Sequence, residues 1–305
     1  MVMNRVMNHR PNGKQVVLKL LVTAFISLSA FGASPSSPQS KTNETDDLVR
    51  QLIEKFTDAD KKGIVVMDLE PAVGQSGSFG PWLADQLSAS LAAQGKTAEV
   101  VDRFQLGAAL EAQHLSLRGQ SDVINAVAVG KSIGATTVVV GSYAAAENGI
   151  GISLAAFRVS EYGIVQSTRF MIGMVFGKIP LTQEVSTHLN VPLDSLRPKD
   201  GVYRSGYGGV SIPACIKCPM SSMHVPDIDI QGMLRAHPKG ATVMLQFVVT
   251  AEGHTRNITV VQPVGYGFDE QYMKMVENWE FKPAVDADNK PVSVNYPFHF
   301  DFNFK

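Results

Sequence analysis

The chain has 305 residues, a formal net charge of −1 and a hydrophobic content of 45%. This length suggests about two domains, each large enough to bury a core. A nearly neutral charge gives no sign of the basic surface typical of nucleic-acid binding, which removes that class of function from consideration.

Residues 1–33 have the pattern of an export signal. A basic start precedes an apolar run of 14 residues, Leu20–Ala33, which ends in small residues. A membrane-spanning helix needs about 20 apolar residues, so we expect a cleaved signal peptide, with an uncleaved N-terminal anchor as the alternative. Either would place the protein in the periplasm or cell envelope. The polar, Pro/Ser-rich residues 34–47 predict a flexible linker.

Strand-type apolar runs alternate with helical patterns between residues 48 and 200. Clear examples are a strand at 62–71, a helix at 81–95, and strands at 136–146 and 149–160. Such alternation predicts an α/β domain with helices packed on a mixed sheet.

Several short motifs in this domain resemble the core of the CsgG-type and FlgO-type envelope proteins, over about residues 60–200. The resemblance implies a fold and an assembly role rather than a chemistry. The matching motifs are Val101–Asp102–Arg103, Gln105–Leu106, Glu111–Leu115, Gly134–Ala135 and Gly141–Ser142–Tyr143.

The sequence offers no catalytic or metal-binding motif. The stretch Ala128–Ser132, AVGKS, lacks the first glycine of a phosphate-binding loop and falls within a helical pattern. The loop Gly74–Gly80 has no G-x-S-x-G nucleophile motif. The seven histidines form no metal-ligand spacing. We therefore expect no cofactor, no metal and no enzymatic activity.

Both cysteines, Cys215 and Cys218, lie in residues 201–221, which we interpret as a linker between the domains. In an exported protein a local disulfide is the favoured interpretation. A redox-active thiol pair is a second interpretation, although proline and glycine surround the pair instead of a helix N-terminus. A zinc site is the third, but only His224 lies near as a further ligand.

Residues 222–305 predict a small α+β domain. Alternating residues at 242–249 and 258–261 flank a turn and indicate a hairpin. An amphipathic helix comes next and stops at Pro283. Trp279 and Phe281 stand at the helix end, where we expect them to close a small core.

From about residue 219 onward, this pattern resembles the C-terminal domain of TonB-family proteins. The motif residues are Thr250–Gly253, Gly265–Asp269, Trp279–Ala284, which includes Pro283, and Lys290–Val292. The resemblance implies a three-stranded antiparallel sheet with two helices. It also implies that the domain binds an outer-membrane partner, whose segment adds as a strand at the sheet edge.

The last strand is the predicted edge. Its aromatic residues share one parity, so one face should be apolar and the other wet, with Pro297 blunting part of the edge. The predicted partner-binding residues are Val294, Asn295, Tyr296, Phe298, His299, Phe300 and Phe302.

The resulting hypothesis is a non-enzymatic, exported envelope protein that binds an outer-membrane transporter or another envelope protein and that could form homo-oligomers. The first alternative is a TonB-type energy transducer, anchored in the inner membrane and coupled to a motor complex there. The second is a thiol-redox protein that uses Cys215 and Cys218.

Overall fold

The computed structural model describes residues 44–94, 98–113, 115, 122–159, 171–219 and 228–302. The predicted signal or anchor at 1–33 lies outside these residues. The predicted linker at 34–47 is wrong at its end, because helix α1 (Glu44–Ile53) already begins there and buries Thr45 and Leu48. Within the described part of the chain, no helix combines the length and apolar character needed to cross a membrane.

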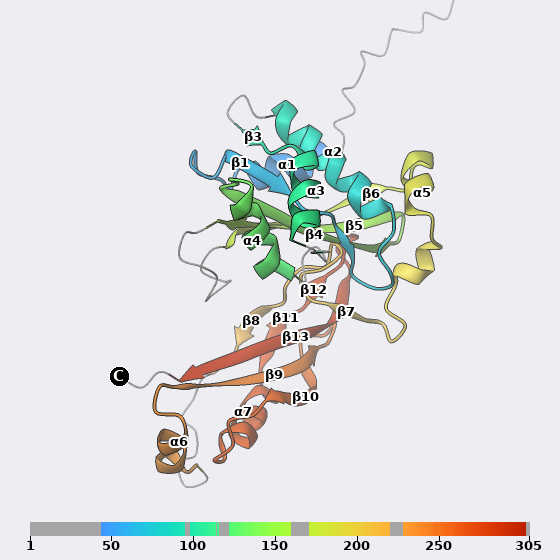
Figure 1. Cartoon of the computed structure of the whole chain (residues 1–305). Helices are drawn as coiled ribbons and strands as arrows, with labels where there is room; N and C mark the ends of the chain where they lie inside the picture. The colour runs from blue at the N-terminus through green and yellow to red at the C-terminus, as the bar shows by residue number, and fades with distance from the viewer. Residues whose placement is uncertain are drawn as a thin grey trace, which may run out of the picture. The chain divides into compact units, whose positions relative to one another are not determined.

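The described residues form a mixed α/β structure with two main sheets (Figure 1). The sheet of the α/β domain has the order β3-β1-β4-β5-β6, with β2 beside β4. Strand β1 runs parallel to β3 and β4, whereas β4, β5 and β6 are antiparallel neighbours. The elements are β1 (Lys62–Val66), β2 (Glu70–Pro71), α2 (Phe79–Gln94), β3 (Glu99–Val100), α3 (Arg103–Ala112), α4 (Val123–Ser132), β4 (Thr137–Ala146), β5 (Gly149–Arg158), β6 (Met171–Pro180), α5 (Gln183–Leu189) and the 3-10 helix η3 (Leu193–Leu196).

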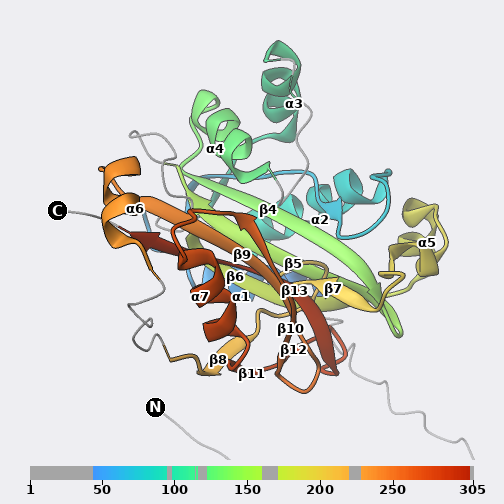
Figure 2. The same cartoon turned by 90° about the horizontal axis from the view of Figure 1, so that it is seen from below.

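Both faces of this sheet are covered, which explains why β4 and β5 read as continuous apolar runs. Alternate residues of β4 enter different cores: Val139 packs with residues of α1 and α2, whereas Val138 and Val140 pack with residues of α3 and α4. Figure 2 shows α3 and α4 on one side of β4.

Helix α1 packs on one face of the edge strand β6. A Cβ atom at Gly177 would lie 2.6 Å from Leu48 Cδ2, and one at Gly173 would overlap the Lys55 side chain. Gly177 thus lets the helix pack directly on the strand, and Gly173 makes room for Lys55, which follows the helix.

The second sheet has the order β10-β9-β13-β12, with β7 also paired to β13. The prediction of a three-stranded sheet is therefore incomplete, because β12 and β7 extend the antiparallel unit β10-β9-β13. The elements are β7 (Val202–Arg204), β8 (Ala214–Lys217), α6 (Ile230–Ala236), β9 (Ala241–Val249), β10 (Thr255–Gln262), α7 (Phe268–Val276), β11 (Glu280–Lys282), β12 (Ala284–Val285) and β13 (Pro291–Phe302).

The interpretation of residues 201–221 as a simple linker is wrong. Strand β7 pairs in parallel with Ser293–Asn295 of β13, and β8 pairs with β11. This segment therefore contributes strands to the C-terminal domain, because its backbone finds hydrogen-bonding partners there.

An ion pair between a buried carboxylate and a half-exposed arginine ties the turn before β1 to the end of β5. Asp60, 1% exposed, accepts hydrogen bonds from Arg158 Nε at 2.7 Å and Nη2 at 2.8 Å, and from Thr57 Oγ1 at 2.7 Å. The Arg158 hydrogen bond is the largest cause that lowers the pKa of Asp60 to about 2, against the opposing effect of burial. The folded state therefore favours the ionised carboxylate.

We expect Asp60→Asn to lower the free energy of unfolding by about 2 kcal/mol at pH 7, since one pKa unit corresponds to about 1.4 kcal/mol. The folded pKa lies below the unfolded one, so this contribution is present above about pH 4 and is lost as pH falls toward 2. Urea unfolding of both proteins at several pH values checks this. A difference in stability that stays constant down to pH 2 would contradict it.

Candidate partner-binding edge

Strand β13 is paired fully on one flank and partly on the other. From Val294 to Phe302 it runs beside β9 without a register shift. On its other flank it pairs with β12 at Pro291–Val292 and with β7 at Ser293–Asn295. Residues 296–302 of that flank pair with no strand in the described part of the chain. We call this stretch the open flank.

Two predicted edge residues are misplaced. Val294 lies between Val249 of β9 and Tyr203 of β7, and Asn295 likewise lies between two strands. These two residues therefore do not belong to an accessible edge. The other predicted residues, Tyr296, Phe298, His299, Phe300 and Phe302, lie along the open flank.

The direction of the backbone groups follows from one hydrogen bond. Ser205 N–H donates to the Asn295 carbonyl at 3.3 Å, so the backbone groups of Asn295 face away from β9. Because these directions alternate along a strand, those of Pro297, His299 and Asp301 also face the open flank. Pro297, which has no N–H, thus costs the β9 ladder nothing. It offers only a carbonyl, whereas His299 and Asp301 each offer a donor and an acceptor.

The opposite edge of this sheet is less regular. The pairing of β10 with β9 contains two register shifts, and Asn257 has a left-handed backbone with φ of 53°. Such irregularities bend an edge and hinder pairing with another strand. The open flank of β13 is therefore the better template for an added strand.

The apolar face of β13 is held by aromatic contacts. Trp279 and Phe281 are 2% and 4% exposed. The Trp279 ring meets Phe298 edge-on at 5.1 Å, and Tyr272 of α7 stacks on Phe300 at 3.8 Å. Burial raises the pKa of Tyr272 to about 12, so its hydroxyl stays neutral. These contacts fix the strand beside the open flank.

The wet face of the strand carries polar contacts. Thr242 Oγ1 donates to Asp301 at 2.7 Å, and His299 Nε2 lies 3.6 Å from the other oxygen of the same carboxylate. Side chains of an added strand would meet both of these polar side chains on this face. On the apolar face they would meet aromatic rings.

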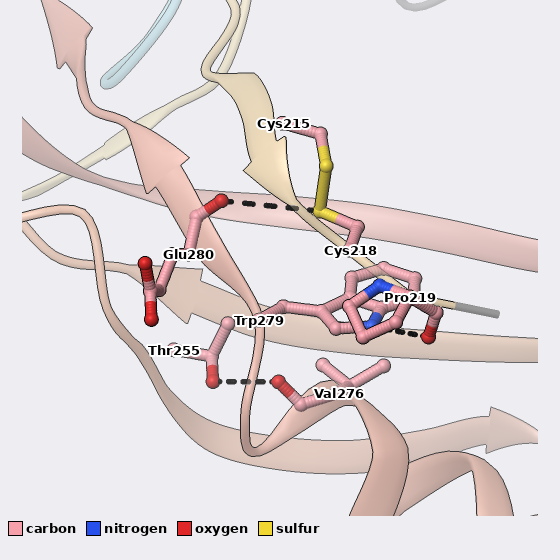
Figure 3. Close-up of a disulfide and its surroundings, with 7 residues drawn as sticks. All are labelled: Cys215, Cys218, Pro219, Thr255, Val276, Trp279 and Glu280. Atoms are coloured by element: carbon pink, nitrogen blue, oxygen red, sulfur yellow. Dashed lines mark hydrogen bonds between the residues drawn. A yellow bond between two sulfur atoms is a disulfide. The ribbon is translucent and has the colours of Figure 1, made fainter. Parts of the chain in front are cut away.

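A disulfide joins Cys215 and Cys218 at the margin of this core (Figure 3). Cys218 Sγ lies 3.9 Å from the Glu280 carbonyl, and Trp279 Nε1 donates to the Pro219 carbonyl at 3.4 Å. The bond therefore fixes a bend against the tryptophan. His224 lies outside the described residues, which contain no cluster of three metal-ligating side chains.

Two stretches of the α/β domain that were compared with catalytic motifs, residues 128–132 and 74–80, have structural positions without a sign of chemistry. Residues 128–132 lie within and complete helix α4, where Gly130 is buried rather than set in a phosphate-binding loop. The loop at 74–80 leads into α2. Neither feature joins the edge described above.

Residues 234–304 match the family described as Gram-negative bacterial TonB protein C-terminal. These residues form a TonB-type C-terminal domain. The chain is thus similar, over this segment, to a family of the Gram-negative cell envelope. No curated protein matches the chain. The resemblance of residues 60–200 to CsgG-type and FlgO-type proteins stays a prediction.

Three solved structures share low similarity. The LpoB C-terminal domain from Salmonella enterica has 18% identity and a TM-score of 0.36, covering 45% of this chain and 96% of its own. The corresponding Escherichia coli domain has 18% identity and a TM-score of 0.34, covering 45% and 98%. Escherichia coli LpoB solved by NMR has 16% identity and a TM-score of 0.35, covering 58% and 83%.

Sequence reasoning missed the residues that limit the edge. Strand β7 is only three residues long and has no recognisable pattern. The glycine-rich stretch after it, Gly206–Gly209, was the available signal, because consecutive glycines often mark a close backbone approach.

We expect Trp279→Ala to lower the free energy of unfolding by about 3–5 kcal/mol, as is usual for a large buried aromatic residue. Trp279→Phe keeps a ring but loses the hydrogen bond to Pro219, so it should cost less, about 1–2 kcal/mol. Urea unfolding followed by circular dichroism compares the two variants. Equal losses would show that the ring does not hold this core.

Replacing both cysteines, Cys215→Ser with Cys218→Ser, should cost at most about 2 kcal/mol, because the disulfide closes a very short loop. Any binding of a peptide along β13 should not depend on the cysteines, since neither lies in that strand. Unfolding and peptide binding of the oxidised wild type and the double variant give both answers. Complete loss of binding in a folded variant would instead favour a functional role for the thiols.

Proposed function

We propose that the protein is an exported, non-enzymatic component of the cell envelope. Its TonB-type domain binds an extended segment of an outer-membrane partner, which adds as a strand along the open flank of β13. We call this added segment the guest strand. The α/β domain serves as an assembly module in the periplasm.

The observation that supports this function most directly is the open flank itself. It lies in the domain matched to the TonB family, and the backbone groups of Pro297, His299 and Asp301 face it. Main-chain hydrogen bonds supply affinity in strand addition, while alternate side chains supply selectivity. A guest strand with alternating apolar and polar residues fits the two faces of β13.

A proline substitution tests the backbone contribution. His299→Pro removes an N–H that faces the open flank, yet it leaves the β9 ladder intact, so the domain should still fold. His299→Ala keeps that N–H and is the matched control. We expect the proline variant to bind at least tenfold more weakly than wild type, and the alanine variant within about threefold.

The assay titrates the full chain with ten-residue synthetic peptides from periplasm-facing segments of the host's outer-membrane transporters. The amide NMR shift of Asp301 reports binding in all three proteins, the amide of residue 299 reports it in wild type and in the alanine variant, and circular dichroism confirms folding. If no peptide shifts these amides, or if both variants bind equally well, strand addition at this flank is wrong.

A further inference from the structure

Strand β7 occupies the part of the β13 flank that a longer guest strand would need. It pairs with Ser293–Asn295 and ends at Arg204. The chain then leaves the edge: Tyr207 N–H donates back to the Arg204 carbonyl at 3.2 Å, and Gly206 has a positive φ of 81°. The open flank begins immediately after the last residue paired with β7.

A three-residue parallel strand has little pairing of its own, so its position depends on the residues next to it in the chain. Gly208 N–H donates to Ser142 Oγ at 3.0 Å, and Gly209 N–H donates to Ser153 Oγ at 2.9 Å. Both serines are fully buried, and they face each other across β4 and β5. We call these two hydrogen bonds the serine clamp.

The clamp admits only glycine. A Cβ atom at Gly209 would lie 2.7 Å from Gly151 Cα, and one at Gly208 would overlap the Ala144 side chain. Both glycines also have positive φ, 60° at Gly208 and 81° at Gly209, which other residues rarely adopt. The loop therefore meets the backbone of β5 at close range.

Only three residues, 205–207, separate β7 from the first clamp glycine. The four Cα-to-Cα steps from Arg204 to Gly208 span at most about 14 Å, so the clamp limits how far β7 can shift along β13. A charged residue of the C-terminal domain, Asp288, also attaches this domain to the α/β domain. Asp288 accepts hydrogen bonds from Lys178 and from the Glu147 backbone, which links the β12–β13 turn to β6 and to the β4–β5 turn.

We propose that β7 is an internal guest strand, held by the serine clamp, that sets the boundary and register of the external guest. This inference rests on the proposed function for the identity of the external strand. The α/β domain thereby determines how much of β13 a partner can use: residues 297–302 while the clamp is closed, and residues from 295 onward once β7 is released. Fixing one end of the site also opposes the register slips to which added strands are prone.

Hydrogen exchange in the full chain, without any peptide, tests whether the serine clamp holds β7 on β13, independently of partner binding. The Asn295 amide faces β7, whereas the Val294 amide faces β9, so the two neighbours report on different flanks. In wild type we expect Asn295 to be protected and His299 and Asp301 to exchange quickly.

The variant Ser142→Ala with Ser153→Ala removes both acceptors of the clamp without adding volume. We expect Asn295 exchange to accelerate at least tenfold while Val294 stays unchanged. Each single variant, Ser142→Ala or Ser153→Ala, should give an intermediate rate and serves if the double variant does not fold. An unchanged Asn295 rate, or equal acceleration of Val294, would overturn the proposal.

A second measurement uses the peptide of the proposed function. In the double variant, its NMR footprint should extend from residues 297–302 to include Asn295. A footprint that still excludes Asn295 would overturn the role of β7 as a boundary. If no peptide binds to wild type, the proposed function fails, but the exchange result on β7 stands by itself.

Discussion

The alternation of backbone hydrogen-bonding groups along β13 governs the C-terminal domain. Even-numbered residues from Val294 to Phe302 bond to β9 and turn their side chains toward α7 and Trp279. Odd-numbered residues direct their backbone groups to the other flank and their side chains to the wet face. One strand thus completes a core and offers a template at once, and Pro297 is tolerated because it falls on the odd parity.

The same alternation explains which parts of the domain the sequence predicts. The aromatic parity of the last strand is a local pattern, so the faces of β13 can be inferred from spacing. The predicted helix end at Pro283 is wrong, because α7 already ends at Val276 and residues Glu280–Lys282 form strand β11. The flanks of β13 cannot be inferred from spacing. Residues 293–295 meet β7, which lies about 90 positions earlier, and no periodicity in three residues signals that pairing. The Asp60–Arg158 pair, 98 positions apart, escapes prediction for the same reason.

The sequence predicts the α/β domain well where strands are long and apolar, as in β4 and β5, and poorly where distant segments of the chain meet in close contact. From the sequence alone, the motif Gly141–Ser142–Tyr143 is only a fold-forming pattern. In the structure, its serine accepts a hydrogen bond from a backbone N–H of the segment predicted to be a linker. A buried hydroxyl needs a hydrogen-bonding partner, and here that partner is another part of the chain. Because Ser142 and Ser153 accept hydrogen bonds from Gly208 and Gly209, the connecting segment is attached to β4 and β5.

The serine clamp changes how the two parts of the chain are understood. A flexible linker would let a TonB-type domain search for its partner independently of the rest of the chain. With the clamp closed, the strand next to the binding edge is instead positioned by glycine contacts with β4 and β5 that leave no space for a side chain. Any event that loosens those contacts would lengthen the available edge of β13, because β7 has only three residues of pairing to retain it. Under the proposed function, the α/β domain would thus influence partner binding without touching the partner.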